Sequence, residues 1–310
     1  MPVYNSENTI EVAIDSVLAQ DRADWRLVVA DNASTDQTAA LVAARAAADP
    51  RITLVRQPTN RGQAFNFSTV FDAADTEYFM WLSGDDSLRS DYLDLCITAL
   101  DRSPELIGVF TEAEGIDGDG NSLGRFREQS GVDRDSPSRP ARLKAAVHAT
   151  VGFAFFGVYR TEALGRSPLL APYVGSDRVL AGALALIGPI RQLPEVAFFS
   201  RIHAQQFSRA VNSNRHRFLS YSGRDAPRFR VLWTTRITTL ARLVWNSGGS
   251  LAERVAMLRI VFGSYLWRIL KGEAMMLVRT GAKAYGNLAG RRVDVKGWIV
   301  RRGEVFESTR

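Results

Sequence analysis

Short apolar runs alternate with amphipathic helical patterns through the first hundred residues, and this alternation constrains the fold more than any other feature. Buried strands are predicted at 25–30 (WRLVVA), 52–55, 78–82 (YFMWL) and 107–111. Helices are predicted between them, at 6–20, from about 36 to 48, after NRGQAFNF to about 75, and around 93–100. Strands separated by helices of this length indicate a largely parallel sheet with helices on its faces. We therefore expect an α/β fold.

The pattern is less regular beyond residue 111. The stretch 112–139 is rich in Gly, Asp, Ser and Arg, which is typical of a loop. Apolar patterns return at 151–160 and 190–199, and a helix is predicted from about 177 to 187. At the other end of the chain, Asn5 or Ser6 is expected to cap the helix at 6–20.

Charge divides the chain into two parts. Residues 1–210 carry 20 Lys and Arg against 27 Asp and Glu, a net charge of −7, whereas residues 211–310 carry 19 against 6, a net charge of +13. We therefore predict two segments with different roles, an acidic domain at 1–210 and a basic, helical C-terminal extension at 211–310. A single cysteine, Cys96, excludes a disulfide framework and favours a reducing, cytoplasmic setting.

Acidic residues follow two of the predicted strands. Asp31 comes directly after LVVA, and Asp85 and Asp86 come after FMWLSG. Open α/β sheets bind ligands outside the carboxyl ends of their strands, and carboxylate oxygens suit Mn2+ or Mg2+ while phosphates complete the coordination shell. Alternatively, Asp85 and Asp86 lie in a turn that caps the next helix.

Six motifs occur in a family-specific order. MPVYNSENTI, VVADNASTDQT, NRGQAFNFS and YFMWLSGDDSL resemble the nucleotide-sugar half of a family 2 glycosyltransferase, and GSDRVLAGALALIG and FFSRIHAQQFSR resemble its acceptor half. The resemblance covers residues 1–210 and is to bacterial inverting nucleotide-sugar transferases. It implies a GT-A fold, with a Rossmann-like mixed sheet flanked by helices.

The resemblance also implies residues that hold the nucleotide. Pro2, Tyr4 and Asp31 match positions beside the base, where a carboxylate accepts a hydrogen bond from a uracil N–H and an aromatic ring stacks. Glu7 belongs to the same donor-binding segment. It is equally explained as an acid on the first turn of its own helix, complementing the helix dipole.

A second group of residues matches positions near the donor diphosphate. Asn60, Arg61 and Gly62 correspond to an Asn-x-Gly element, where an Arg neutralises phosphate and a Gly permits close backbone approach. Arg201 and His203 correspond to an Arg-x-His element, in which the Arg pairs with diphosphate and the His ligates the metal or contacts phosphate. Arg61 is alternatively a solvated surface charge, and His203 a structural polar residue.

The segment SGDD matches the metal-binding Asp-x-Asp motif, with Ser83 in place of the first acid. Asp85 and Asp86 are therefore the expected metal ligands for Mn2+ or Mg2+. Asp177 in GSDRVL matches the carboxylate that takes a proton from the acceptor hydroxyl. Its alternative role is to cap the helix that begins there.

These implications predict a metal-dependent inverting glycosyltransferase that uses a nucleoside-diphosphate sugar, UDP-linked, and acts on a cell-surface glycan or lipid-linked acceptor. One alternative is a noncatalytic scaffold that keeps the fold and binds nucleotide sugars or membranes. A nucleotidyltransferase is a second alternative, but it requires a Gly- and Lys/Arg-rich phosphate loop, which PVYNSEN is not.

Two further segments leave alternatives open. The aromatic residues of 151–160 belong to the core or line the acceptor site. The pattern at 251–271 predicts a basic amphipathic helix that lies on an anionic membrane at the inner face of the cell, packs on the acidic domain, or does both. No nucleic-acid-binding motif accompanies the charge, so nucleic acid is not an expected partner.

The start of the chain lacks the apolar first strand that family members carry before their PVYN-like turn. A missing strand leaves backbone groups of its neighbours unpaired. We therefore expect the natural chain to begin upstream of Met1, or another segment to fill the position.

Overall fold

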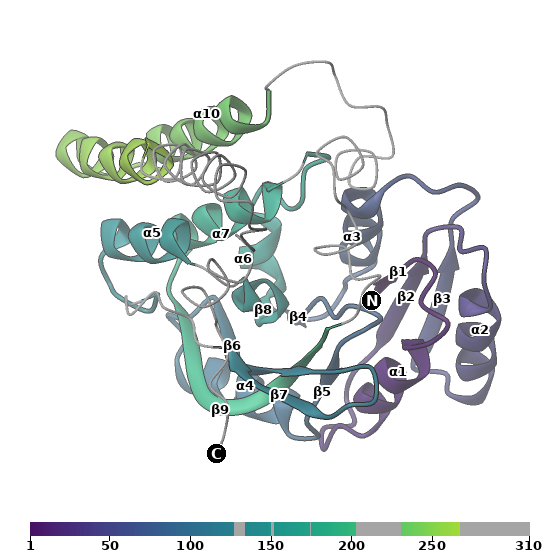
Figure 1. Cartoon of the computed structure of the whole chain (residues 1–310). Coiled ribbons are helices and arrows are strands. Elements are labelled where there is room, and N and C mark those ends of the chain that lie inside the picture. The colour runs from purple at the N-terminus through teal and green to yellow at the C-terminus, as the bar shows by residue number, and fades with distance from the viewer. Residues whose placement is uncertain (127–133, 150–151, 174, 203–230, 267–310) are drawn as a thin grey trace, which may run out of the picture.

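The computed structural model describes residues 1–126, 134–149, 152–173, 175–202 and 231–266 (Figure 1). Within these ranges, two sheets lie side by side and helices flank both of them. The helices are α1 (Ile10–Leu18), α2 (Thr38–Ala48), α3 (Gln63–Asp72), α4 (Tyr92–Arg102), α5 (Arg139–His148), α6 (Thr161–Gly165), α7 (Ser176–Ile187), α10 (Val231–Asn246) and a short 3-10 helix, η1 (Phe153–Phe156). The strands are β1 (Pro2–Val3), β2 (Leu27–Asp31), β3 (Ile52–Arg56), β4 (Tyr78–Phe79), β5 (Ser87–Leu88), β6 (Gly108–Ile116), β7 (Ser122–Phe126), β8 (Val158–Arg160) and β9 (Ile190–Arg201).

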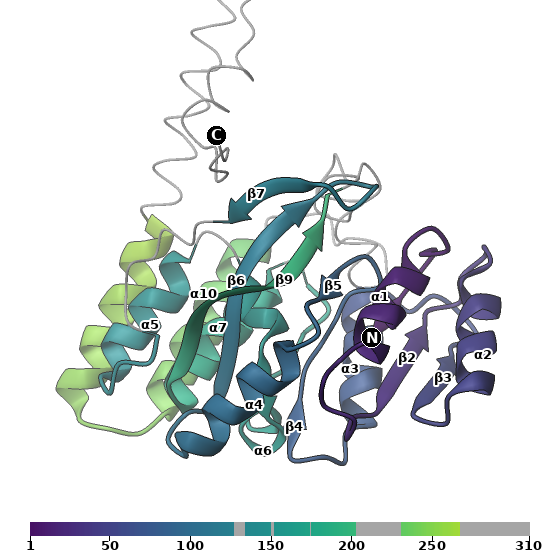
Figure 2. The same cartoon turned by 90° about the horizontal axis from the view of Figure 1, so that it is seen from below.

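The first sheet has the order β1-β2-β3 and is entirely parallel. Helix α1 lies on one face of β2 and α3 on the other (Figure 2). Leu27 and Val29 accordingly pack in the same cluster as Ile14 of α1, whereas Ala30 packs with Phe67 of α3. A strand covered on both faces is apolar at consecutive positions, which is why residues 27–30 (LVVA) form a continuous apolar run.

The second sheet has the order β4-β8-β6-β9-β5, with β7 paired to β6. Strands β6 and β9 are parallel, and the other pairs are antiparallel. Val109 of β6 packs in the cluster that contains Cys96 of α4, and the next residue, Phe110, packs in the cluster that contains Leu184 of α7. The expected mixed α/β fold with flanking helices is confirmed. The largely parallel sheet predicted from the alternation of strands and helices is correct for the first sheet and wrong for the second.

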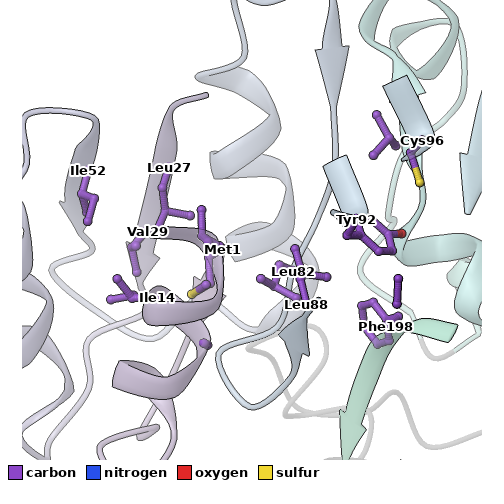
Figure 3. Close-up of a cluster of buried hydrophobic side chains, with 14 of the residues drawn as sticks. Met1, Ile14, Leu27, Val29, Ile52, Leu82, Leu88, Tyr92, Cys96 and Phe198 are labelled. Carbon is purple, nitrogen blue, oxygen red and sulfur yellow. The ribbon is translucent and has the colours of Figure 1, made fainter. Parts of the chain in front are cut away.

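One apolar cluster connects the two sheets (Figure 3). It extends from Met1, Ile14 and Val29 through Leu82 and Leu88 to Tyr92, Cys96 and Phe198. Close packing of this kind resists relative movement of its parts. The carboxyl ends of β1 and β2 are therefore held in a fixed position relative to the segment that follows β4.

Part of the basic C-terminal segment packs on the rest of the chain. Residues of α10 and of the helical stretch 251–266 form a third cluster with α5 and α7: Leu143, Val147, Leu186, Leu240, Val244, Met257, Val261 and Tyr265. A Cβ on Gly182 of α7 would lie 2.7 Å from Leu240 Cδ1, so the glycine gives the Leu240 side chain room to pack directly on α7. The predicted packing of the C-terminal extension on the acidic domain is therefore confirmed for these residues. The domain boundary at residue 210 stays a prediction. None of the helices in the described ranges has the length and apolar character needed to cross a membrane.

The predicted cap of the first helix is wrong. Helix α1 begins at Ile10, and Thr9 is its N-cap residue. Asn5 has a φ of 50° and makes its polar contacts with another loop, while the Ser6 carbonyl accepts hydrogen bonds from Thr9 N and Ile10 N. The turn before α1 is therefore longer than the apolar spacing indicated.

Two other predicted boundaries are wrong. Residues 112–139 are not one loop, because β6 continues to Ile116, β7 follows a turn, and α5 begins at Arg139. Pairing with β9 along the whole of β6 stabilises these polar strand positions. In the predicted strand 78–82, only Tyr78–Phe79 pair with β8, although Trp81 and Leu82 are buried.

The position beside β2 is not empty. Pro2 and Val3, which the resemblance places in a turn, form β1 and pair with Ala30 and Asp31. The Met1 amino group donates a hydrogen bond to Val28 O at 2.6 Å, and Ala30 N donates to Met1 O. Whether the natural chain begins upstream stays a prediction.

Candidate functional site

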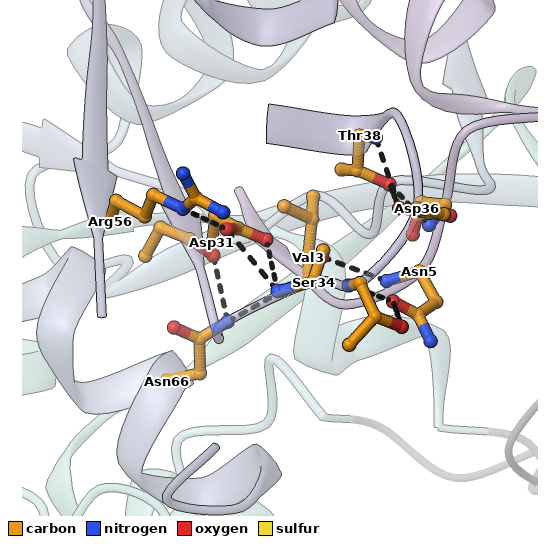
Figure 4. Close-up of polar contacts among 11 residues, drawn as sticks. Val3, Asn5, Asp31, Ser34, Asp36, Thr38, Arg56 and Asn66 are labelled. Atoms are coloured by element: carbon orange, nitrogen blue, oxygen red, sulfur yellow. Dashed lines mark hydrogen bonds and ion pairs between the residues drawn. The ribbon is translucent and has the colours of Figure 1, made fainter. Parts of the chain in front are cut away.

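The loops that follow β1 and β2 are joined by hydrogen bonds at the carboxyl edge of the first sheet (Figure 4). Asn5 N donates to Ser34 Oγ at 2.9 Å, and Thr35 N donates to Asn5 Oδ1 at 2.9 Å. Ser6 N donates to Thr38 Oγ1 at 2.7 Å. The motifs PVYNSEN and DNASTDQT, about thirty residues apart, therefore form a single rigid unit.

Glu7 reinforces the same junction from outside α1. Its backbone N–H donates to Asp36 Oδ2 at 3.2 Å, and its carboxylate accepts the N–H of Gln37, the N-cap residue of α2, at 2.9 Å. The expectation that Glu7 lies on the first turn of its own helix is wrong. Its negative charge lies at the N-terminus of α2, where it complements the dipole of that helix.

A third loop is tied to the second by two asparagines. Asn32 Nδ2 donates to Asn60 Oδ1 at 3.0 Å, and Arg61 N donates to Asn32 Oδ1 at 3.0 Å. Asn60 Oδ1 also accepts Gly62 N at 2.9 Å, and Gly62 adopts a φ of 88° that favours glycine. The exposed guanidinium of Arg61 lies over the Phe65 ring, 3.4 Å from its centroid. The loop thus presents a cation at the surface directly before α3.

Asp31 is completely buried at the end of β2. Its carboxylate accepts the N–H of Ser34 at 3.1 Å and forms an ion pair with Arg56 Nε at 3.5 Å, and Arg56 is its register partner on β3. Pro2 is also buried, whereas Tyr4 is 46% exposed. Among the residues expected to hold the base, Tyr4 has an accessible ring, and a base contact by Asp31 stays a prediction.

Asn66 of α3 is a buried residue of this junction that the sequence patterns did not single out. Its Nδ2 donates to Ala30 O at 2.8 Å and to Val3 O at 3.3 Å, so one amide joins the ends of β1 and β2. Its Oδ1 has no hydrogen-bond partner among the described residues. An asparagine on the apolar face of α3, between Ala64 and Phe67, is the sequence signal that identifies it.

The segment SGDD packs closely against the carboxyl edge of the first sheet. A Cβ on Gly84 would lie 2.8 Å from Val3 Cγ1, and Thr9 Oγ1 donates to Gly84 O at 2.8 Å. Glycine is therefore required for the backbone to approach β1 this closely. All four donor-half motifs meet at one place, as their resemblance implied.

Asp86 is only 4% exposed, and its Oδ1 accepts the N–H of Arg201 at 3.0 Å. Burial and the neighbouring negative charge of Asp85 raise its pKa well above the usual value. A bound cation would offset both effects, and two carboxylates are the ligands that Mn2+ and Mg2+ prefer, so these residues fit such a metal chemically. The described residues contain no group of three His, Cys, Asp or Glu side chains placed to hold a metal, and His203 lies outside them. Ligation by Asp85, Asp86 and His203 stays a prediction.

Arg201 is turned inward. Its Nε donates to Asp85 O at 3.2 Å, and its Nη1 donates to Asp117 O at 2.8 Å and Gly118 O at 2.7 Å. The buried guanidinium thus joins SGDD to the turn between β6 and β7. These contacts give Arg201 a positioning role and no support to the expected pairing with diphosphate.

Asp177 is exposed on the first turn of α7. Gly175 is the N-cap residue, with a φ of 86°, and no side chain caps this helix. The alternative that Asp177 is a capping residue is therefore wrong, and its carboxylate lies at the surface.

Arg236 of α10 lies beside this helix start and was missed from sequence. A Cβ on Gly175 would overlap Arg236 Cζ, so the guanidinium rests against the backbone two residues before Asp177. Burial lowers the pKa of Arg236, and the charge of Asp177 opposes that change. The C-terminal segment thereby brings a cation near the candidate base. No local pattern connects positions 177 and 236.

The aromatic residues of 151–160 belong to the core. Phe155 stacks on Trp81 with centroids 4.9 Å apart, and Phe153 and Phe156 pack against the main clusters. Core packing was one of the two alternatives for this segment, and the structure confirms it.

Comparison with known proteins places these motifs in a family context. Residues 1–165 match the model of Glycosyl transferase family 2. The succinoglycan biosynthesis protein ExoO of Rhizobium meliloti (strain 1021) is 31% identical over 215 residues, which are 67% of this chain and 61% of that protein. The chain therefore spans about three fifths of the length of this relative.

Two solved structures share the fold. S. aureus TarS 1–349 in complex with UDP-GlcNAc matches with a TM-score of 0.62 and 17% identity, over 85% of this chain and 70% of that one. The mannosyltransferase PcManGT from Pyrobaculum calidifontis, in complex with GDP-Man and Mn2+, matches with a TM-score of 0.50 and 20% identity, over 93% of this chain and 85% of that one.

Proposed function

Because the chain belongs to glycosyl transferase family 2, we propose that it transfers a sugar, with inversion, from a nucleoside-diphosphate sugar to a hydroxyl group. The donor is UDP-linked, and the acceptor is a cell-surface glycan or a lipid-linked sugar. The observation that carries the proposal is the junction of the loops after β1 and β2, NRG and SGDD at one sheet edge. The UDP-GlcNAc in the TarS complex and the role of ExoO in succinoglycan biosynthesis support the donor and acceptor classes.

The exposed residues of the junction bind the donor. The ring of Tyr4 stacks on the base, and Arg61 neutralises phosphate charge beside the N-terminus of α3. Asn32 and Asn60 fix the loop that carries Arg61. Binding to a preformed loop avoids the entropic cost of ordering it.

Asp177 acts as the general base. As the acceptor oxygen attacks the anomeric carbon, Asp177 takes the hydroxyl proton, the bond from that carbon to the diphosphate oxygen breaks, and the nucleoside diphosphate leaves. Arg236 of α10 brings a positive charge to the start of the helix that carries Asp177. Mn2+ or Mg2+ held by Asp85 and Asp86, with His203 as a further ligand, would stabilise charge on the departing diphosphate.

We place the protein in the cytoplasm, at the inner face of the cell membrane, where a lipid-linked acceptor would be met. The basic charge of residues 211–310 supports this location.

A donor screen tests the proposal. Purified protein is incubated with UDP-, GDP- and dTDP-sugars, with and without Mn2+, and nucleoside diphosphate release and product are measured. We expect the wild type to release sugar from a UDP-sugar when Mn2+ is present and not when it is absent. We expect Asp177→Asn to lose this activity. A folded protein that neither binds UDP nor hydrolyses any donor would instead be a noncatalytic scaffold, an alternative that Ser83 and the internal hydrogen bond of Asp86 favour.

A further inference from the structure

The helical stretch 251–266 has two apolar faces, of which the fold uses one. Met257, Val261 and Tyr265 are buried against α5 and α10. Large apolar side chains on a different face are 36% to 62% exposed: Leu251, Val255, Phe262 and Leu266. We call these four residues the apolar stripe.

The apolar stripe is continuous along the helix. At 100° per residue its members fall within an arc of about 60°, and it extends over about 22 Å. The stretch lies at the end of the molecule opposite α2, next to α10 (Figures 1 and 2). Trp245, at the C-terminal end of α10, is also half exposed, and Arg254 lies over its ring. Aligned apolar residues of this size are a feature of interaction surfaces.

The charges around the stripe are positive. Residues 231–266 contain four Arg and one Glu, and that acid, Glu253, forms an ion pair with Arg139 at 3.6 Å. On the helical wheel, the exposed Arg259 borders the stripe on one side, and Arg254 lies on the other side beyond the partly buried Leu258. The remaining 44 residues, 267–310, add ten Lys and Arg against four acids in the sequence.

We propose that the apolar stripe inserts into the surface of an anionic lipid bilayer, with Trp245 at the interface and the surrounding arginines on lipid headgroups. An amphipathic helix with apolar residues on one side and cations beside them has the pattern of interfacial helices. Charge complementarity favours a bilayer over a second copy of the chain, because two copies would bring like charges together. An anionic bilayer is thus the partner of this helix at the proposed location, the inner face of the cell membrane. Binding to it does not depend on whether the protein transfers sugar.

Flotation with vesicles tests the surface on the full chain. Vesicles of phosphatidylcholine with and without about a third phosphatidylglycerol are compared. The wild type is expected to bind the anionic vesicles, and a variant with Leu251, Val255, Phe262 and Leu266 all changed to Gln is expected to bind at least about tenfold less, since apolar burial drives insertion. Glutamine preserves helix propensity, and circular dichroism verifies folding.

A matched control changes exposed apolar residues elsewhere. Val12→Gln with Leu123→Gln removes two such residues from α1 and β7, and its vesicle binding is expected to equal that of the wild type. Equal binding by the stripe variant, or no binding by the wild type, would overturn the proposal. Donor hydrolysis by the same proteins without vesicles is measured separately, so a failed transferase assignment is distinguished from a failed docking surface.

A fluorescent label identifies the face that contacts lipid. Cys96 is buried and burial raises the pKa of its thiol, so a label attaches selectively to an introduced cysteine. A label at Val255→Cys is expected to shift to the blue when anionic vesicles are added, whereas a label at Ala256→Cys, exposed off the stripe, is not. A label at Val255→Cys that is already shifted without lipid would mean that residues 267–310 or a second copy cover the stripe, which would also overturn the proposal. Light scattering then tells these two occupants apart.

Discussion

Asn32 and Asn60 face each other across two loops, with Asn32 Nδ2 3.0 Å from Asn60 Oδ1. The two amides also accept the backbone N–H groups of Arg61 and Gly62, so the loop that carries Arg61 is shaped by side chains and not by regular secondary structure. This pair links the loop after β2 to the loop after its neighbouring strand, β3.

Replacing Asn32 by Ala removes both of its amide contacts with this loop. We expect a loss of stability of about 1–3 kcal/mol and roughly tenfold weaker UDP binding, because the Arg61 loop is no longer fixed. Urea unfolding and titration calorimetry measure the two effects. Asn246→Ala, at the exposed end of α10, is the matched control and should leave UDP binding unchanged. Wild-type UDP affinity in Asn32→Ala would show that the loop is fixed by other contacts.

Replacing Asp177 by Asn removes an exposed carboxylate and keeps a side chain of the same size. Transfer is expected to fall about 100- to 10,000-fold while UDP binding and the unfolding midpoint stay constant. Asp24→Asn, at another largely exposed acid, serves as the control. Near-normal transfer by Asp177→Asn with unchanged donor binding would disprove the assignment of the base.

Replacing Gly175 by Ala tests the contact between α10 and the start of α7. Gly120 has a similar φ of 89°, and nothing lies within 4 Å of the position that a Cβ would take there, so Gly120→Ala isolates backbone strain, which costs about 1 kcal/mol. Gly175→Ala is expected to cost about 1–3 kcal/mol more because its Cβ overlaps the Arg236 guanidinium. It should also reduce transfer. Equal destabilisation of the two variants in urea would show that Arg236 moves away freely.

Replacing Asp86 by Asn separates its structural role, as the acceptor for the N–H of Arg201, from its proposed role as a metal ligand. Asparagine keeps an oxygen for the N–H of Arg201, so Asp86→Asn is expected to fold, whereas Asp86→Ala leaves that N–H unpaired and costs about 1–3 kcal/mol. Loss of the carboxylate should weaken Mn2+ binding in both variants. Electron paramagnetic resonance of free Mn2+ measures this. Wild-type Mn2+ affinity in Asp86→Asn would assign Asp86 a purely structural role.

In a chain that begins at Met1, the buried amino group makes stability depend on pH. Burial lowers its pKa from 8.0 to about 5. Between these values the unfolded chain holds a proton that the folded chain does not, so this group makes stability rise from pH 5 to pH 8 and stay constant above. The full difference is about 4 kcal/mol at 1.36 kcal/mol per pKa unit.

Acetylation of the same amino group provides the comparison. The difference in unfolding free energy between the free and acetylated chains is expected to change with pH only between about 5 and 8, and mass spectrometry verifies that Met1 is present. A difference that does not vary with pH would show that the amino group is hydrated in the folded chain.

The sequence was informative wherever a local pattern decides the structure. The apolar run of β2 and the helical spacing of α7 were recognisable because burial on a strand or on one helix face repeats with a fixed period. The β6–β7 hairpin was missed because its polar residues are typical of a loop. Long-range pairing with β9 stabilises these positions as a strand, and a local pattern does not indicate that pairing.

The sequence by itself determined the family, the mixed α/β fold and the set of polar residues that gather at one sheet edge, because motif order and periodicity are local properties. The tertiary structure decided which of those groups are already engaged. Arg201 binds carbonyls more than 80 residues away, and Arg236 reaches the start of α7 from α10. Such partners depend on how distant segments pack, so no periodic pattern in the sequence predicts a hydrogen bond between them.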